Sequence, residues 1–585
     1  MCGIFCSLTR NSIEPEGGKL DEHTKKLLQN RGPDLQSQHQ VECNDFTVTF
    51  AGFVLWQQGN AATVQPVVDR DHIMLFNGDI YSTGSVTSKT PEQSDTEWLF
   101  SKIAQCNEEI EFFDLMKHIQ GPFSLIYFNN KSKRLYFARD SLGRQTLLIG
   151  SYRNSICITS VASKVAGDNS FIEVPPLGIF SLNLSNSAGD FNIELSTWQD
   201  LSVHEHFAEQ LGSVGKVIGS QISLHENLEP FWMQTDDSRS DRYTFTSLLS
   251  EHLDKSPLDI LTILSQCKEV VSTSDELIDL LTRSLKQRVE ATPQLCKNCI
   301  KSPVVKECNH PKVGILFSGG IDCTILALMA HEIIDSANAI DLINVSFEKI
   351  NRNPSANRAN ENYETPDRLT SRQTLKELTE LCPNRKWNLI EVNVTREELK
   401  EALKEKISDL CYPLNSILDE SLGAALWFAA SSKGLVNSVH YESPCRVLLI
   451  GSGADELFGG YTRHRNAFLR SGQSWTHLDN ELNLDWTRLP SRNLARDDRI
   501  IGDHSVTARS PFVEENVAFY VRNLNSSQKC FHLLPEGVGD KLLLRLCGFR
   551  MGLRNVCWLK KRALQFGSRV ADRKQNAKDV SDALR

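Results

Sequence analysis

The second half of the chain is predicted to be a doubly wound parallel α/β sheet. From residue 313 onward, apolar runs typical of buried strands alternate with helical stretches. Two of these expected strands are followed directly by a glycine-rich loop that carries an aspartate, Asp322 in one and Asp455 in the other. In sheets of this kind, ligands bind at the carboxyl ends of the strands. The two loops are therefore the first candidates for a functional site.

The elements of this sheet follow one another at regular intervals. The expected strands are Val313–Phe317, Leu342–Phe347, Trp387–Val394 and Arg446–Ile450. The expected helices between them are Cys323–Ala330, Ser371–Cys382 and Leu418–Ser432.

The first loop, Ser318–Gly319–Gly320, turns the chain from a strand into an apolar helix. Free backbone amides at a helix N-terminus form an anion site, and phosphate is the usual ligand. No Gly-Lys-Ser/Thr follows, so the loop is not the common P-loop. It is either a tight strand–helix turn or a pyrophosphate-binding loop. Two carboxylates near bound phosphates, Asp322 and Asp455, are what a magnesium ion needs.

Composition and charge limit the function classes. The 585 residues are 40% hydrophobic and 23% charged, which is ordinary for a soluble protein of two or three domains. The net charge of −9 argues against a nucleic-acid partner. No apolar run reaches the length of about 18 residues that a membrane span requires. The 16 cysteines show no regular spacing and no signal peptide is evident, so we expect reduced thiols and a cytoplasmic enzyme.

The N-terminus offers a candidate nucleophile. Removal of the initiator methionine would leave Cys2 with a thiol and a free α-amino group, and this amine can act as general base for its own side chain. The alternative is a small residue at the start of a strand. A helix is expected to start near Trp98, capped by Ser94 and Glu97, and a hairpin-like turn is expected at Arg139–Arg144.

Four motifs in this region resemble the class II glutamine amidotransferase domain of the N-terminal nucleophile type. They are Met1–Cys2–Gly3–Ile4, Arg31–Gly32–Pro33–Asp34, Asn77–Gly78–Asp79–Ile80–Tyr81 and Ser94–Asp95–Thr96–Glu97. The resemblance covers residues 1–185 and implies an α-β-β-α sandwich in which Cys2 releases ammonia from glutamine. It also implies that Asn77 and Gly78 form the oxyanion hole, and that Asp79 and Asp95 bind the α-amino end of glutamine. Val54 stands where the family has an arginine that binds the glutamine α-carboxylate.

Residues 186–271 are expected to be a linker or insertion, with a polar loop at Met233–Arg242. A capping box at Thr273 and Glu276 is expected to open the second domain, residues 272–585. Near its start, Cys296, Cys299, Cys308 and His310 form either a metal site or a surface insertion, because the first pair has zinc spacing and the second pair is unusually close.

The two glycine loops together are similar to the synthetase domain of asparagine synthetases, an ATP-pyrophosphatase domain. Further matches are Arg496–Asp497–Asp498–Arg499, Ala508–Arg509–Ser510–Pro511–Phe512, Lys541–Leu542–Leu543–Leu544–Arg545 and Lys560–Lys561–Arg562, and the Pro366–Asp367–Arg368 segment is closest to an animal branch of asparagine synthetase domain-containing proteins. The resemblance implies that ATP and Mg²⁺ activate a carboxylate, with release of pyrophosphate, before ammonia attacks. It implies metal ligands Asp322 and Asp455, and an ATP and pyrophosphate site made of Leu316, Ser318, Gly319, Gly320, Asp322, Cys323, Val345, Gly451, Gly453 and Lys541.

Three hypotheses follow from these motifs. The first is a glutamine-hydrolysing enzyme of asparagine biosynthesis that uses glutamine, ATP and aspartate. The second is an amide ligase for another carboxylate. The third is a catalytically impaired binding or regulatory protein. Ser452 stands where the family has a glutamate that handles the aspartyl-adenylate, and together with Val54 it favours the second or third hypothesis.

Overall fold

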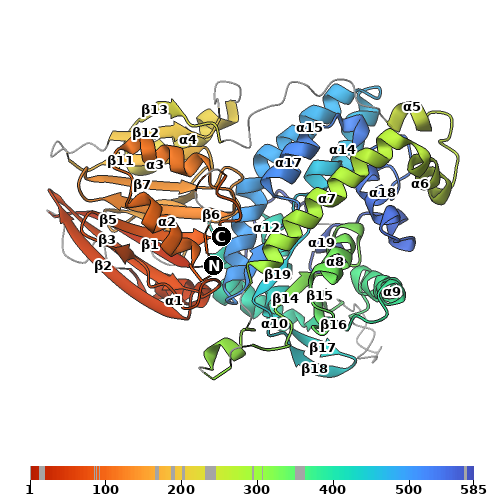
Figure 1. Ribbon diagram of the computed structural model, residues 1–585, viewed down its shortest axis with the longest axis horizontal. Helices are drawn as coiled ribbons and strands as arrows, with labels where there is room; N and C mark the ends of the chain where they lie inside the picture. Colours follow the sequence, from red (N-terminus) through yellow and green to blue (C-terminus); the bar gives the residue numbers. More distant parts are fainter. Residues whose placement is uncertain are drawn as a thin grey trace.

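The computed structural model consists of two lobes that lie side by side (Figure 1). It describes residues 2–11, 20–84, 86, 89–90, 92–164, 170–185, 192–199, 205–230, 245–292, 295–302, 304–305, 307–349, 363–571 and 576–584. The expected polar loop at Met233–Arg242 lies outside these ranges. Among the helices described, none is both long enough and apolar enough to cross a membrane.

The first lobe contains two sheets, whose strands pair antiparallel except for one parallel pair at an edge. The first sheet has the order β10 (Ser170–Glu173), β8 (Leu148–Tyr152), β9 (Ser155–Thr159), β1 (Gly3–Arg10), β3 (Phe46–Val54) and β2 (Leu35–Cys43). The second has the order β13 (Ile222–Asn227), β12 (Asn192–Thr197), β11 (Gly178–Asn183), β7 (Arg134–Arg139), β6 (Phe123–Asn129), β5 (His72–Gly78) and β4 (Val67–Val68).

These sheets form the two middle layers of an α-β-β-α sandwich. Alternate residues of β5 face opposite sides: Leu75 packs between the sheets with Ile4, whereas Phe76 faces the helices α2 (Asp95–Ile103) and α3 (Glu109–Lys117). On the other side, α1 (Glu22–Arg31) packs against β1 and β3. A fourth helix, α4 (Glu205–Ile218), contacts β8, β10 and β13. The predicted sandwich is confirmed, as is the capping box of Ser94 and Glu97 at the start of α2.

Two expectations about local structure are wrong. The turn at Arg139–Arg144 is not a hairpin, because β7 lies in the second sheet and β8 in the first. Arg139 is fully buried at this crossing and donates to the carbonyls of Gln145 and Val174. Thr273 lies inside a helix rather than capping it, and its hydroxyl donates to the carbonyl of Glu269, one turn earlier.

The segment expected to be a linker is largely folded where the structure describes it. Strands β12 and β13 and helix α4 extend the first lobe to Asn227, well past residue 185. The second lobe begins with α5 (Phe245–Leu249) and α6 (Pro257–Gln266), which pack in its core through Leu249, Ile260 and Leu264. Short apolar stretches joined by polar ones made this segment hard to interpret from sequence.

The second lobe is built around one sheet of seven strands. Its order is β18 (Val439–Glu442), β17 (Lys433–Val436), β16 (Trp387–Val394), β15 (Ile340–Phe347), β14 (Val313–Leu316), β19 (Val447–Leu449) and β20 (Thr507–Arg509). Five neighbouring strands, β16, β15, β14, β19 and β20, are parallel. Strands β17 and β18 form a hairpin that pairs antiparallel with β16 at one edge of the sheet. Leu342 and Ile343 of β15 belong to cores on opposite faces, as a doubly wound sheet requires.

Helices cover both faces of this sheet (Figure 1). One core contains residues of α7 (Lys268–Glu290), α8 (Ile321–Ile333) and α18 (Leu542–Arg550), and the other contains residues of α10 (Arg396–Ala402), α12 (Ile417–Ser431) and α16 (Ala495–Gly502). The remaining helices are α9 (Pro366–Leu381), α11 (Ser408–Cys411), α13 (Ala454–Phe458), α14 (Thr462–Arg470), α15 (Trp475–Leu489), α17 (Glu515–Arg522) and α19 (Leu564–Gly567). The second core also includes Phe5, Leu27 and Phe53 of the first lobe, so one continuous apolar cluster joins the two lobes.

Candidate functional site

The loop between β14 and α8 presents backbone amides at the carboxyl edge of the sheet. Gly319 has a φ of +79°, and a Cβ placed on it would lie 2.7 Å from the backbone nitrogen of Ser371 in α9. The carbonyl of Gly319 accepts a hydrogen bond of 2.9 Å from Thr374 Oγ1. No side chain in the described part of the chain caps the first turn of α8. The loop therefore has the form of an anion site at a helix N-terminus.

The second glycine loop lies beside the first because β14 and β19 are neighbouring parallel strands. Gly453 has a φ of +93°, which lets the chain turn into α13 and places Asp455 in its first turn. A Cβ placed on Gly451 would lie 3.1 Å from Cβ of Asp322. The topology of the sheet thus brings together two aspartates that are far apart in the sequence.

Lys541 lies between these two aspartates. Its Nζ is 2.6 Å from Oδ2 of Asp322 and 2.8 Å from Oδ1 of Asp455, and its side chain is 1% exposed. Lys561 approaches Asp455 as well, with Nζ 3.2 Å from Oδ2. Burial alone would lower the pKa of Lys541, but the charges of Asp322 and Asp455 outweigh it and hold the pKa above its ordinary value. Lys541 is therefore a cation at any physiological pH.

These residues border a cleft of about 530 Å³. Of the residues predicted for the ATP site, the cleft is lined by Leu316, Ser318, Gly320, Asp322, Cys323, Gly451, Gly453, Asp455 and Lys541. Gly319 packs against the backbone of α9 instead, and Val345 packs in the core with Leu448 and Ile450. Oδ1 of Asp322 is buried and has no hydrogen-bond partner among the described residues. A carboxylate oxygen in this position fits Mg²⁺, which prefers oxygen ligands.

The cleft also contains charged residues to which the sequence assigned no role. Glu456 is buried beside Asp455 and accepts a hydrogen bond of 2.7 Å from the hydroxyl of Tyr461. Burial raises the pKa of Glu456 to about 7. Arg496, Lys560 and Lys561 line the same cleft. Glu456 directly follows the predicted metal ligand and Arg496 lies in a matched motif, so motif positions alone could have indicated both.

Cys2 lies at a second, smaller cavity of about 50 Å³ in the first lobe. Its backbone nitrogen donates to Oδ1 of Asn77 over 2.6 Å, and Nε2 of Gln65 lies 3.7 Å from its Sγ. Gln65 is itself fixed, because its amide exchanges hydrogen bonds with the backbone of Phe76. Burial raises the pKa of the Cys2 thiol, and the backbone amide of Leu55 and the charge of Arg31 partly offset this.

The other predicted glutamine-binding residues line the same cavity, and two of them hold ion pairs. Gly78, Asp79 and Asp95 border it together with Val54. Asp79 accepts two hydrogen bonds of 3.0 Å from the Arg509 guanidinium of the second lobe. Asp95 is paired with Lys89 and accepts from the backbone of Ile80 over 2.7 Å. The structure thus brings the predicted residues together.

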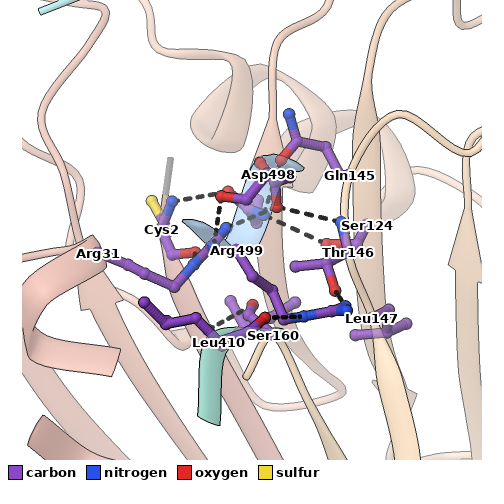
Figure 2. A network of polar contacts seen from close by, with 12 residues as sticks. Cys2, Arg31, Ser124, Gln145, Thr146, Leu147, Ser160, Leu410, Asp498 and Arg499 are labelled. Carbon is purple, nitrogen blue, oxygen red and sulfur yellow. Dashed lines mark hydrogen bonds and ion pairs between the residues drawn. The ribbon is translucent and has the colours of Figure 1, made fainter. Parts of the chain in front are cut away.

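A network of buried charges joins Cys2 to the second lobe. In Figure 2, Arg31 lies between Cys2 and Asp498. Nη2 of Arg31 is 2.9 Å from Oδ2 of Asp498. Asp498 also accepts from the backbone of Thr146, whose hydroxyl accepts from Arg499 over 2.7 Å. Arg31, Asp498 and Arg499 are each at most 3% exposed. Side chains of the second lobe therefore hold the wall of the Cys2 cavity in place.

Comparison with known proteins matches both lobes to known domain families. The glutamine amidotransferase domain model matches residues 1–173, and the asparagine synthase model matches residues 308–475 and 469–579. The chain is similar to asparagine synthetase domain-containing protein CG17486 of Drosophila melanogaster, with 42% identity over all of both chains. It is also similar to asparagine synthetase domain-containing protein 1 of Homo sapiens, with 33% identity over 100% of this chain and 97% of the human one. This chain belongs to the family of asparagine synthetase domain-containing proteins.

More distant members of this family and asparagine synthetases match too. Asparagine synthetase domain-containing protein YML096W of Saccharomyces cerevisiae is 26% identical over 98% of this chain and 96% of its own length. Two of the positions that the resemblance marks as departures from asparagine synthetases lie at the candidate sites. Val54 is buried in the wall of the Cys2 cavity, and Ser452 lines the cleft of the second lobe.

Proposed function

We propose that the chain is a glutamine-dependent amide ligase of the asparagine synthetase type, which forms asparagine from aspartate and converts ATP to AMP and pyrophosphate. The convergence of Asp322, Asp455 and Lys541 beside a glycine-rich loop in a 530 Å³ cleft carries this proposal. The family match and the nucleophile position of Cys2 support the glutamine-dependent part. The irregular spacing of the 16 cysteines supports a cytoplasmic location.

In the cleft, the amides of the Ser318–Gly320 loop would bind the pyrophosphate part of ATP. Mg²⁺, held by Asp322 and Asp455, would neutralise charge on the phosphate oxygens when bound. Lys541, whose side chain is 1% exposed, would oppose the negative charge that develops on the leaving pyrophosphate. The carboxylate substrate is thereby activated as an acyl-adenylate, which ammonia then attacks with release of AMP.

In the first lobe, the thiol of Cys2 would attack the side-chain carbonyl carbon of glutamine. The carbon–nitrogen bond breaks, ammonia leaves, and water then releases glutamate from the thioester. Removal of Met1 would make the nitrogen of Cys2 a free amine, and Asn77 Oδ1 lies 2.6 Å from that nitrogen. Asn77 and Gly78 would stabilise the oxyanion, and Asp79 and Asp95 would bind the α-amino group.

A cavity between the two sites supports transfer of ammonia inside the protein. A third cavity of about 20 Å³ lies between the lobes, on the order of one water-sized molecule. Gln145 lines both this cavity and that of Cys2, and Ile450 lines both this cavity and the ATP cleft. The three cavities therefore follow one another from the thiol to the glycine loops.

Exchange of labelled pyrophosphate into ATP tests the synthetase half. We expect exchange that requires aspartate and Mg²⁺, and we expect Lys541→Ala to reduce it at least a hundredfold. Lys433→Ala is the matched control, because Lys433 is an exposed lysine on the hairpin β17–β18. If no carboxylate supports exchange, both ligase hypotheses are ruled out and the chain is a binding or regulatory protein.

Cys2→Ala tests the glutaminase half independently. We expect this variant to lose glutamine hydrolysis while ammonia-dependent product formation continues. Cys106→Ala is the control, because Cys106 is a half-buried cysteine of the same lobe that lies beside α2. If the wild-type protein hydrolyses no glutamine, the first lobe serves only as a scaffold.

A second candidate function is an amide ligase for a carboxylate other than aspartate. Ser452 favours it, because a hydroxyl at the cleft replaces the glutamate that would handle an aspartyl-adenylate. The same exchange assay, run with a panel of amino-acid and hydroxy-acid carboxylates, distinguishes the two candidates. Exchange stimulated by another acid and not by aspartate favours the second.

A further inference from the structure

Cys296, Cys299, Cys308 and His310 gather at one point on the surface of the second lobe. One ligand atom from each residue lies within 4.8 Å of the ligand atoms of the other three. Nδ1 of His310 is 3.6 Å from Sγ of Cys296 and 3.4 Å from Sγ of Cys299. Tetrahedral zinc, with Zn–S near 2.3 Å and Zn–N near 2.0–2.1 Å, places such sulfur and nitrogen atoms about 3.6 Å apart. The cluster therefore has the dimensions of a zinc site.

The backbone around the cluster is arranged as it is around metal-bound thiolates. The amide of Cys299 points to Sγ of Cys296 over 3.4 Å, and the amide of Cys296 points to Sγ of Cys308 over 3.2 Å. Sulfur accepts hydrogen bonds of this kind best as a thiolate. The short spacing from Cys308 to His310, which argued against a metal in the sequence, presents no obstacle because both side chains reach the same point.

The position of the cluster favours a structural role. It joins the segment after α7 to the segment before β14. It therefore lies at the amino ends of the parallel strands, opposite the carboxyl ends that border the ATP cleft. Lys297, between the first two cysteines, donates its backbone amide to the carbonyl of Pro444 and its Nζ to that of His504, each over 2.8 Å. Four protein ligands leave no open position for a substrate, as is usual for structural zinc.

We propose that Cys296, Cys299, Cys308 and His310 bind one zinc ion, which fastens the connection between α7 and β14 to the base of the sheet. Binding would convert three thiols to thiolates and release three protons, so that the Zn(Cys)₃His centre carries one negative charge. The tetrahedral sulfur and nitrogen donor set favours zinc over magnesium or calcium, which prefer oxygen. This site is independent of the proposed ligase activity.

Elemental analysis of the purified full-length protein tests the proposal. For protein prepared without chelator or histidine tag, we expect about one zinc per chain. The double variant Cys299→Ser/His310→Ala should contain at least tenfold less zinc. The matched control is Cys106→Ser/Cys267→Ser, which replaces two half-buried cysteines outside the cluster and should retain the metal. Equal zinc in both double variants would overturn the proposal.

A second measurement covers the case in which the double variant does not fold. Wild-type protein stripped with a chelator is titrated with cobalt(II), and its visible and near-ultraviolet spectrum is recorded. We expect tetrahedral d–d bands and thiolate-to-cobalt charge transfer, which zinc then displaces. Absence of both bands, together with absence of zinc in the protein as purified, would overturn the site. A disulfide among Cys296, Cys299 and Cys308 in freshly prepared protein, detected by intact mass, would do the same.

Discussion

Asp79 contributes to both lobes at once. It lines the Cys2 cavity of the first lobe, while its carboxylate is held by Arg509 from β20 of the second. Burial raises the pKa of Asp79, but the Arg509 guanidinium outweighs this effect and holds the pKa below its ordinary value. Arg509 in turn donates to the carbonyl of Arg288 near the end of α7. A residue expected to bind glutamine is therefore also part of the lobe interface.

Replacing Asp79 is expected to destabilise the protein strongly. Asp79→Asn leaves the buried guanidinium of Arg509 without its counter-charge, and loss of one member of a buried pair costs about 3–5 kcal/mol. The double variant Asp79→Asn/Arg509→Gln should be less destabilised than the sum of the single variants. Chemical denaturation followed by fluorescence measures each change. Asp114→Asn, at an exposed pair with Lys117, is the control and should cost less than about 1 kcal/mol.

His532 is one of the buried histidines expected to make stability depend on pH. His532 is 1% exposed, and neither ring nitrogen has a hydrogen-bond partner among the described residues. Burial, and next the charge of Arg465, lowers its pKa to about 3; the nearby His464 lowers it too, and Asp540 opposes them. The unfolded chain, with a histidine pKa near 6.5, therefore binds more protons, so the contribution of His532 to stability is complete above about pH 6.5 and is lost as the pH falls.

The variant His532→Phe tests this dependence. Between pH 6.5 and pH 5, His532 should account for about 1.5 kcal/mol of lost stability, which the phenylalanine variant keeps. Denaturation midpoints of both proteins at the two pH values measure the difference. An identical loss in the variant and the wild type would contradict the assignment.

At the scale of elements, the strand–loop–helix unit from β14 to α8 depends on one glycine. Gly319 combines a positive φ with an approach of 2.7 Å to the backbone of α9. Gly319→Ala would cost about 1–2 kcal/mol for the left-handed conformation and would also displace α9 or the loop. We expect ATP to bind at least tenfold more weakly, as measured by calorimetry. Gly472→Ala is the control, because Gly472 has a φ of +73° but no atom near its Cβ position.

Elements with a strong periodic pattern were predictable from the sequence. Strand β16 has the predicted bounds, Trp387–Val394, and β14, β15, α8, α9, α12 and β19 each overlap the predicted range. Their apolar runs and the glycines that follow them depend on local chemistry alone. The hairpin expected at Arg139–Arg144 failed because the choice of sheet depends on tertiary hydrogen bonds of Arg139, which no local pattern contains.

The same distinction holds for the sites. Motif residues such as Asp322 and Asp455 follow parallel strands, as the strand pattern predicted, and the structure adds that these two strands are neighbours. The pairing of Asp79 with Arg509 was not predictable, because 430 residues separate the two and nothing in the sequence relates them. Likewise, the sequence left the cysteine–histidine cluster open between a metal site and a surface insertion, and the metal site became favoured only once its four side chains had been placed.

At the scale of the whole molecule, the lobes share an apolar cluster and several buried ion pairs. Nε of Arg144, in the first lobe, is 2.9 Å from Oδ1 of Asp140. Nη1 of the same arginine donates to Oε2 of Glu515 in α17 over 3.0 Å. Oε1 of Glu515 also accepts from the backbone of Gly121 over 2.8 Å. Arg144 further lines the interlobe cavity next to Gln145. The pair therefore helps to shape the wall of the route proposed for ammonia.

Glu515→Gln is expected to uncouple the two lobes. Without the negative charge, Arg144 keeps only Asp140 as an ionic partner among the described residues, and we expect the cavity wall to loosen. Glutamine-dependent product formation should fall at least fivefold relative to ammonia-dependent formation, because ammonia escapes. Glu194→Gln is the control, since Glu194 pairs with Arg134 within the first lobe, away from the interface. Equal changes in both activities would argue against a protected route.

Three buried ion pairs constrain how the two lobes can evolve and be recombined: Arg31–Asp498, Arg144–Glu515 and Arg509–Asp79. Each pair has one partner in each lobe, so a change in one lobe is tolerated only if the other lobe changes with it. We expect these positions to covary among relatives rather than to drift singly. A chimera that joins the first half of one family member to the second half of another should fold only when all three pairs are matched. The two halves of this chain are not interchangeable modules.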